Sequence, residues 1–253
     1  MIHYHGLPIT PASAACAAVT GGHAFVSFRY KDQLGVVLEV CQSFAVDNGA
    51  FSAWRSGKPV QDWGHYYEWV DGLRKTPSFD FAVIPDEIDG DEKANDALLA
   101  EWPWRGSTKN GWVGAPVWHM HESIDRLRRL AEEWPRVCIG SSGQYATVGD
   151  SKWWTRIAEA MNAICCPTTG QPICKLHGLR MLDPDVFTRL PFSSADSTNI
   201  AQNIGIDKAW RGTYTPPNKD VRAAVMRSRI ESHQATTIWR HQEMQTQFCL
   251  EAK

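Results

Sequence analysis

The stretch that decides the fold is Phe44–Trp54, FAVDNGAFSAW. Apolar residues run straight into Asp47-Asn48-Gly49, and an aromatic residue, Phe51, follows the turn. A short apolar run of this kind is typical of a strand that is covered on both faces, as the strands of a parallel sheet are. Asp47 would then stand where the strand emerges, which is where α/β proteins hold their catalytic groups. A single Asp before Asn-Gly also fits a simple turn cap, so the interpretation depends on whether the pattern recurs.

The pattern does recur along the chain. Six further apolar runs predict strands, and most are separated by stretches with helical periodicity; the runs are Ala24–Phe28, Phe79–Asp86, Ala115–His119, Val137–Gly140, Ile173–His177 and Pro191–Asp196. An eighth strand is either Ile2–His5 or Ile204–Ile206. Helix starts are predicted at residues that favour N-caps, and these are Thr10 (before Pro11), Asp62, Asp91, Ser123, Asp150 and Asp183.

Strands that alternate with helices predict a parallel sheet in an α/β protein. Seven or eight such units in about 210 residues favour a (β/α)8 TIM-like barrel over an open sheet, because no Gly-rich dinucleotide turn follows the first strand. We therefore expect a barrel domain over residues 1–215. Residues 216–253 are expected to form a C-terminal helical extension, with a helix over Asp220–Gln234.

Composition narrows the class of protein. The chain has 253 residues, of which 43% are hydrophobic and 21% are charged, as in an ordinary globular protein. A net charge of −2 argues against nucleic-acid binding through overall charge, although a local basic groove is compatible with it. No apolar run approaches the roughly 20 residues of a membrane span. Seven cysteines without a regular spacing indicate free thiols in a reducing compartment, so a cytoplasmic location is expected.

Polar residues stand at the predicted strand ends. They are Asp47, Asp86, His119, the Gly140–Gln144 segment, His177 and Asp196. In a barrel these ends meet in one mouth, so several carboxylates would converge there. Two carboxylates in different environments can divide the nucleophile and acid/base roles, as cleavage at a sugar anomeric carbon requires.

These segments resemble the tRNA-guanine transglycosylases, and more closely their phage and bacterial DNA-acting relatives, the DpdA-type 7-deazaguanine transglycosylases. Asp47-Asn48-Gly49-Ala50-Phe51 is similar to the family's Asp-Ser-Gly-Gly-Phe segment, and Pro85-Asp86-Glu87 to the segment that reads the base edge. Gly140-Ser141-Ser142-Gly143 resembles the segment that lines the base pocket, and Ser194–Asn199 the one with the nucleophilic Asp. His119 falls where the family has a base-contacting Gln. The order of the segments, from about Gly6 to Gly205, carries the resemblance.

The resemblance implies a base exchange in DNA. Asp196 would attack C1′ of a flipped-out deoxyguanosine, and Asp47 would protonate the departing guanine and later deprotonate an incoming 7-deazaguanine base such as 7-cyano-7-deazaguanine. The substrate-binding residues would be Asp86, His119, Gly140, Ser141, Ser142, Gly143, Gln144 and Phe51. Because related enzymes dimerise, a homodimer is one expected state of this protein. The resemblance also implies that the protein works in the cytoplasm of a bacterium or of a phage-infected host.

The chain departs from the tRNA-acting members in two respects. Their Cys/His zinc site follows the nucleophile segment, whereas here only Cys249 follows Asp196, so no metal and no cofactor is expected. The spacing of Cys165, Cys166, Cys174 and His177 fits no common zinc pattern, and core or loop thiols explain these residues more simply. The chain is also shorter and has no appended RNA-binding domain, which favours a DNA-acting form by resemblance.

DNA phosphates require cations, and basic residues are dense after Asp196. The candidates are Lys208, Arg211, Arg222, Arg227 and Arg229, although a solvated helix face explains them equally well. Two other functions use the same pocket. One is a DNA or nucleoside N-glycosylase with water as acceptor, and the other is a non-catalytic barrel that binds a modified purine.

Overall fold

The computed structural model describes residues 1–105, 113–206, 210 and 214–240. Its strands are β1 (Ile2–Gly6), β2 (His23–Ser27), β3 (Ser43–Asp47), β4 (Phe79–Val83), β5 (Gly114–Ala115), β6 (Val117–His119), β7 (Arg136–Gly140), β8 (Lys175–Gly178) and β9 (Ser194–Ser197). Its helices are α1 (Ala12–Val19), α2 (Leu34–Val40), α3 (Ala50–Arg55), α4 (Gly64–Leu73), α5 (Glu92–Glu101), α6 (Ile124–Glu133), α7 (Ser151–Ile164), α8 (Pro184–Phe187), α9 (Asn199–Asn203) and α10 (Lys219–Glu231). A short 3₁₀ turn, η1, covers Gly143–Tyr145.

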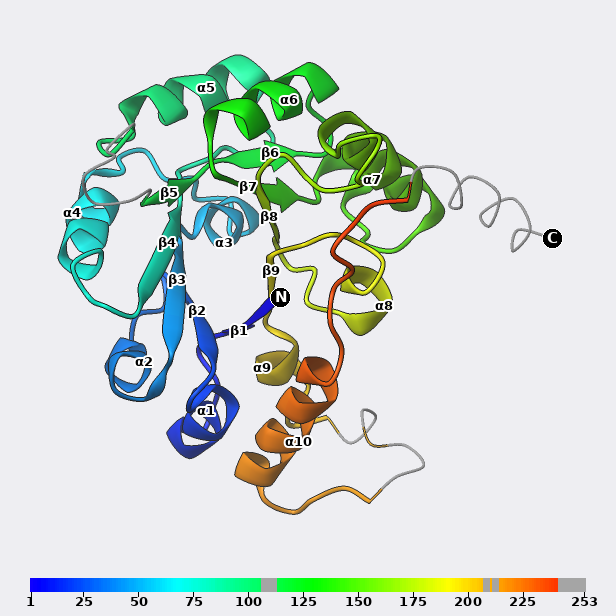
Figure 1. Cartoon of the computed structure of the whole chain (residues 1–253). Helices are drawn as coiled ribbons and strands as arrows, with labels where there is room; N and C mark the ends of the chain where they lie inside the picture. Colours follow the sequence, from blue (N-terminus) through cyan, green and yellow to red (C-terminus); the bar gives the residue numbers. More distant parts are fainter. Residues whose placement is uncertain (106–112, 207–209, 211–213, 241–253) are drawn as a thin grey trace.

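The strands form one parallel sheet in the order β5-β4-β3-β2-β1-β9-β8-β7-β6. β5 and β6 are two halves of one segment, divided at Pro116, which has no N–H to donate to a ladder. The carbonyl of Ala115 accepts a hydrogen bond from Ile84 after β4, and that of Pro116 accepts one from Cys138 in β7. The two edges of the sheet therefore meet at this segment, and the predicted (β/α)8 barrel is confirmed, with its helices around the outside (Figure 1).

Alternating side chains along each strand build two cores. In β3, Phe44 and Val46 pack outward against the helices, whereas Ala45 faces the barrel interior. The interior is filled by Tyr4, Phe25, Ala45, Phe81, Val83, Ala115, Val117 and Cys138, so the barrel is a packed core and not a channel.

Side-chain caps begin several helices where the sequence predicts them. Asp91, Ser123 and Asp150 accept hydrogen bonds from backbone N–H groups in the first turns of α5, α6 and α7, at 2.8, 3.1 and 2.7 Å. Thr10 was predicted to cap α1, but Pro11 occupies the N-cap position and no side chain caps this helix. Tight packing of its small residues against α10 stabilises α1 instead.

Several boundaries differ from the prediction. The eighth strand is β1, since residues 204–206 follow α9 as a turn. The strand expected over Ile173–His177 begins only at Lys175, and Ile173 is exposed. The helix expected over Asp220–Gln234 ends at Glu231.

α10 packs along α1, so it takes a place in the ring of helices around the barrel (Figure 1). Residues 232–240 then pass the amino ends of the strands. The Trp239 N–H donates a 2.7 Å hydrogen bond to the Gly170 carbonyl. No helix among the described residues is long and apolar enough to cross a membrane.

Candidate active site

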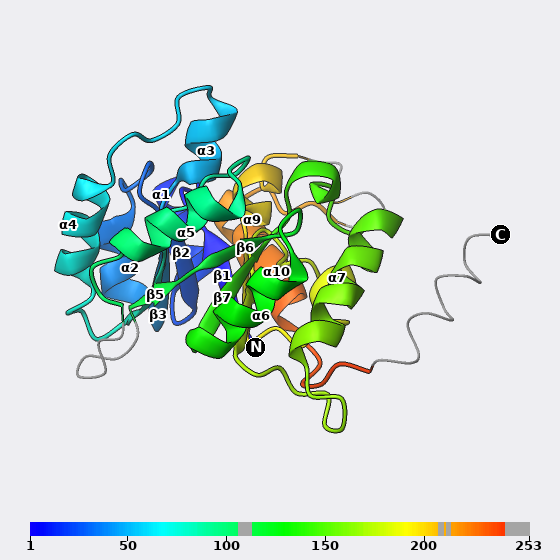
Figure 2. The ribbon, with the colours of Figure 1, turned by 90° about the horizontal axis from the view of Figure 1, so that it is seen from above.

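A cavity of about 710 Å³ opens at the carboxyl ends of the strands. It is bordered by α3, which lies across the barrel opening in Figure 1 and stands at one end of the barrel in Figure 2. Seven of the predicted site residues line it, and these are Asp47, Phe51, Asp86, His119, Gly140, Ser141 and Asp196. Three carboxylates from β3, the segment after β4, and β9 therefore share one cavity of a size that accepts a nucleoside.

Asp47 is the last residue of β3 and is half-buried in this cavity. Its Oδ2 accepts a 3.1 Å hydrogen bond from the Gly49 N–H, within a turn that needs Gly49 because φ is +81° there. Burial and the nearby Asp196 and Asp86 carboxylates raise the pKa of Asp47 to about 7. Asp47 can therefore carry a proton at neutral pH, as a general acid must.

Asp86 is buried and is held by two neighbours. Asn48 Nδ2 donates a 2.7 Å hydrogen bond to its Oδ1, and His119 Nε2 lies 2.9 Å from its Oδ2. Asn48 is fixed in turn, because its Oδ1 accepts from the Ala50 N–H and its Nδ2 also donates to the Ile84 carbonyl. A carboxylate oxygen has two lone pairs, so Asp86 retains acceptor capacity for a ligand.

Asp196 lies in β9, beside β8 and β1 in the sheet. Its Oδ1 accepts a 2.9 Å hydrogen bond from the Arg180 N–H, and His177 Nε2 lies 3.3 Å from the same oxygen. Burial lowers the pKa of His177, whose ring stacks on Phe25 inside the barrel. A backbone N–H stabilises the ionised form of a carboxylate, the form that a nucleophile requires.

Arg180 is a cavity residue that the sequence did not reveal. It has a positive φ of 59°, which is rare outside glycine, and its guanidinium lies 3.9 Å above the Phe51 ring. Its Nη2 donates a 2.9 Å hydrogen bond to the Ser141 carbonyl. Burial lowers the pKa of Arg180, and the Asp196 and Asp47 carboxylates oppose that change. Arg180 thus places a cation over the cavity without forming an ion pair with any of its acids.

The Gly140–Gln144 segment only partly lines the cavity. Gly140 and Ser141 reach it, and a Cβ at Gly140 would come within 3.2 Å of His119 Nδ1. Ser142 is buried against His121 Nδ1 at 2.8 Å, whereas Gly143 and Gln144 are exposed in η1. These three residues do not line the cavity.

The three predicted DNA-contacting arginines that the structure describes bind separate parts of the fold. Lys208 and Arg211 lie outside the described residues. Arg222 binds the Pro216 and Ile204 carbonyls, and Arg229 stacks on Trp210 at 4.8 Å. Arg227 binds the Thr20 carbonyl beside the amino end of β2, at the opposite end of the barrel from the cavity. The α10 arginines thus support the fold and form no common track toward Asp196.

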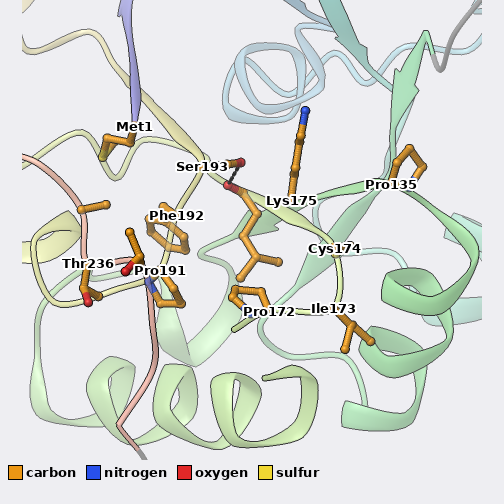
Figure 3. Close-up of a pocket in the computed structure, with 13 residues that line it drawn as sticks. Met1, Pro135, Pro172, Ile173, Cys174, Lys175, Pro191, Phe192, Ser193 and Thr236 are labelled. Carbon is orange, nitrogen blue, oxygen red and sulfur yellow. Dashed lines mark hydrogen bonds between the residues drawn. The ribbon is translucent and has the colours of Figure 1, made fainter. Parts of the chain in front are cut away.

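A second cavity, of about 630 Å³, lies at the amino ends of the strands (Figure 3). Proline, aliphatic and threonine side chains line it, with Lys175 as its charged side chain and no carboxylate among its lining residues. Within the described residues, no three His, Cys, Asp or Glu side chains gather into a metal site. The cavity with acidic side chains is therefore the one at the carboxyl ends of the strands.

Comparison with known proteins assigns no family. No protein-family model matches the sequence, and no curated protein matches it. A solved structure described as a structural study of a protein from Aquifex aeolicus VF5 is similar over 90% of this chain and 92% of that chain, with 10% sequence identity and a TM-score of 0.49. That likeness concerns the course of the chain and says nothing of a substrate.

Proposed function

We propose that this protein exchanges guanine in DNA for a 7-deazaguanine base. The proposal depends mainly on one observation, the convergence of Asp47, Asp86 and Asp196 in one cavity. Carboxylates that converge repel one another, so such an arrangement is retained where a reaction uses it. Nucleoside chemistry at C1′ uses one carboxylate as nucleophile and another as proton carrier.

In the first half-reaction, an Asp196 oxygen attacks C1′ of a flipped-out deoxyguanosine. The C1′–N bond breaks, its electron pair leaves with guanine, and Asp47 supplies the proton that neutralises the departing base. In the second half-reaction a nitrogen of the incoming base attacks C1′ and loses its proton to Asp47, while the bond between C1′ and Asp196 breaks and its electron pair returns to the carboxylate. The pKa of about 7 at Asp47 supports this double role, because such a group gives and takes protons at neutral pH.

Asp86 would recognise the base. Its carboxylate is oriented by Asn48 and stands beside His119, so its remaining lone pairs can accept hydrogen bonds from a purine amide and amine. Phe51 supplies a ring at the cavity wall for stacking. Trp118 cannot do so, because it is fully buried and donates its Nε1–H to the Ser123 carbonyl.

The test is to mix the protein with guanine-containing DNA and labelled 7-cyano-7-deazaguanine and to follow label into the DNA. Asp196→Asn should lower incorporation to about a ten-thousandth or less, and Asp47→Asn to between a hundredth and a ten-thousandth. Asp125→Asn is the control, since this residue is exposed on α6 and lies outside the cavity. A covalent protein–DNA adduct should form with the wild type and be absent with Asp196→Asn.

The other functions give different results. Guanine release without incorporation would identify a glycosylase that uses water. Binding of the free base without any release or adduct would identify a non-catalytic purine-binding barrel. Either result would overturn base exchange.

A further inference from the structure

Two arginines at the cavity mouth have side chains without a partner among the described residues. Among the arginines of the described residues, Arg29 and Arg55 alone form no hydrogen bond, ion pair or ring contact through their side chains. Both are exposed. Cations without a protein partner that flank a reactive cavity are suited to an anion brought by a ligand.

Both arginines are placed by the segment that also carries Asp47. Arg55 ends α3 and lines the cavity. The stem of Arg29 packs on Gly49, where an added Cβ would lie 2.7 Å from Arg29 Cγ. The turn after β3 is therefore shaped to hold the Arg29 stem against the mouth, while its guanidinium stays in solvent.

Exposed aromatic rings accompany these cations. Tyr30 is 48% exposed and lines the cavity, and Trp54 is 42% exposed on α3. The Trp54 and Phe51 ring centroids lie 5.6 Å apart, and the Arg180 guanidinium stacks on the Phe51 ring. Trp54 Nε1–H donates to Asp89, which fixes the ring edge. A row of flat groups thus leads from solvent into the cavity.

We propose that this rim, formed by Arg29, Tyr30, Trp54 and Arg55, binds single-stranded nucleic acid. Arg29 and Arg55 would contact phosphates that flank the nucleotide in the cavity, and Tyr30 and Trp54 would stack on unpaired bases. Stacking needs exposed base faces, which a duplex does not offer, so the rim selects an unpaired strand. The identity of the nucleotide in the cavity rests on the proposed function, whereas strand binding by the rim does not.

Fluorescence anisotropy with a labelled single-stranded DNA of about 15 nucleotides tests the rim. The double variant Arg29→Ala/Arg55→Ala should weaken binding at least about tenfold and flatten the slope of log K against log salt by about 1.4, since two phosphate contacts are lost. Tyr30→Ala and Trp54→Ala should each weaken binding about fivefold or more. The matched control is Arg105→Ala/Arg128→Ala, which removes two exposed arginines from the region of α5 and from α6. Its affinity should match that of the wild type.

The outcomes separate the rim from the reaction. Equal weakening in the control, or unchanged binding in Arg29→Ala/Arg55→Ala with a wild-type melting temperature, overturns the rim. Equally tight binding of a duplex of the same sequence, with the same loss in the rim variant, overturns its selection of an unpaired strand. If the rim variant fails to bind while the wild type exchanges no base, the rim stands and the proposed function falls. If base exchange proceeds equally in both, the function stands and the rim falls.

Discussion

The two ends of the barrel differ in whether their acids have a cationic partner. At the amino end, the Arg136 guanidinium lies 3.1 Å from Asp80 and 4.1 Å above the Phe81 ring, and Tyr4 donates its hydroxyl to the same Asp80. At the carboxyl end, Asp47 has no cationic partner among the described residues, and its neighbours Asp86 and Asp196 are also acids.

The ion pair at the amino end stabilises the barrel, whereas the three neighbouring carboxyl groups at the other end cost stability, above all at Asp47. Barrel enzymes generally divide the two roles in this way. The difference indicates which substitutions should change folding and which should change activity, and it can be tested at both ends.

The largest stability change is expected at Asp47. Its pKa is 3.8 in an unfolded chain and about 7 in the folded protein, so the folded state binds more protons between these pH values. The unfolding free energy contributed by this group therefore falls as pH rises from about 4 to about 7 and is constant above. Asp47→Asn should make the protein more stable than the wild type at pH 8, by as much as about 4 kcal/mol, and the gain should vanish near pH 4.

Urea unfolding of both proteins at pH 4, 6 and 8 measures this gain. Asp125→Asn, on the exposed face of α6, should follow the wild type at every pH. A stability difference at Asp47→Asn that does not change with pH would contradict a protonated Asp47 in the folded state.

The opposite sign is expected at the amino end. Arg136→Ala leaves the Asp80 carboxylate, which also accepts from the buried Tyr4 hydroxyl, without its cation, and this should cost about 3 kcal/mol. Activity per folded molecule should be unchanged, because Arg136 lies at the far end of the strands from the cavity. Denaturant unfolding and the base-exchange assay on the same samples measure the two effects. Loss of activity in a fully folded Arg136→Ala variant would show that the two ends of the barrel are coupled.

The sequence predicted the barrel because each strand carries its own signal, an apolar run that ends near a polar residue. The eighth strand was ambiguous, because Ile2–His5 and Ile204–Ile206 are both short apolar runs. β1 completes the barrel because it pairs with β9, nearly 200 positions further along the chain. No local sequence pattern encodes a pairing at this separation.

The cavity residues that were predicted stand at the ends of their own strands. The one that was missed enters the cavity through contacts with residues distant in sequence. Asp47, Asp86 and Asp196 meet because the strands are parallel, whereas Arg180 is recognisable only through Phe51 and Ser141, which are distant in sequence. The dense arginines of α10 looked available, but Arg227 binds a carbonyl 207 positions away. Local charge density does not reveal whether a cation already has a partner.

The smallest effect concerns backbone strain, which also separates the two ends. Among the described non-glycine residues, only Arg180 has a positive φ, and it stands at the mouth. Arg180→Gly and Arg180→Ala both remove the guanidinium from Phe51 and Ser141, and both keep the N–H that binds Asp196. A Cβ at this φ costs the alanine variant about 1–2 kcal/mol, whereas glycine loses more backbone entropy on folding, so the glycine variant should be the more stable by about 1 kcal/mol at most.

Thermal unfolding of the two Arg180 variants side by side measures that difference. Equal stability would mean that the backbone relaxes once the guanidinium is gone, and the positive φ would then be imposed by the side-chain contacts. A more stable glycine variant would place the strain in the backbone that presents its N–H to Asp196. Strain held at the residue that orients the proposed nucleophile is expected where function, and not stability, fixes the local conformation.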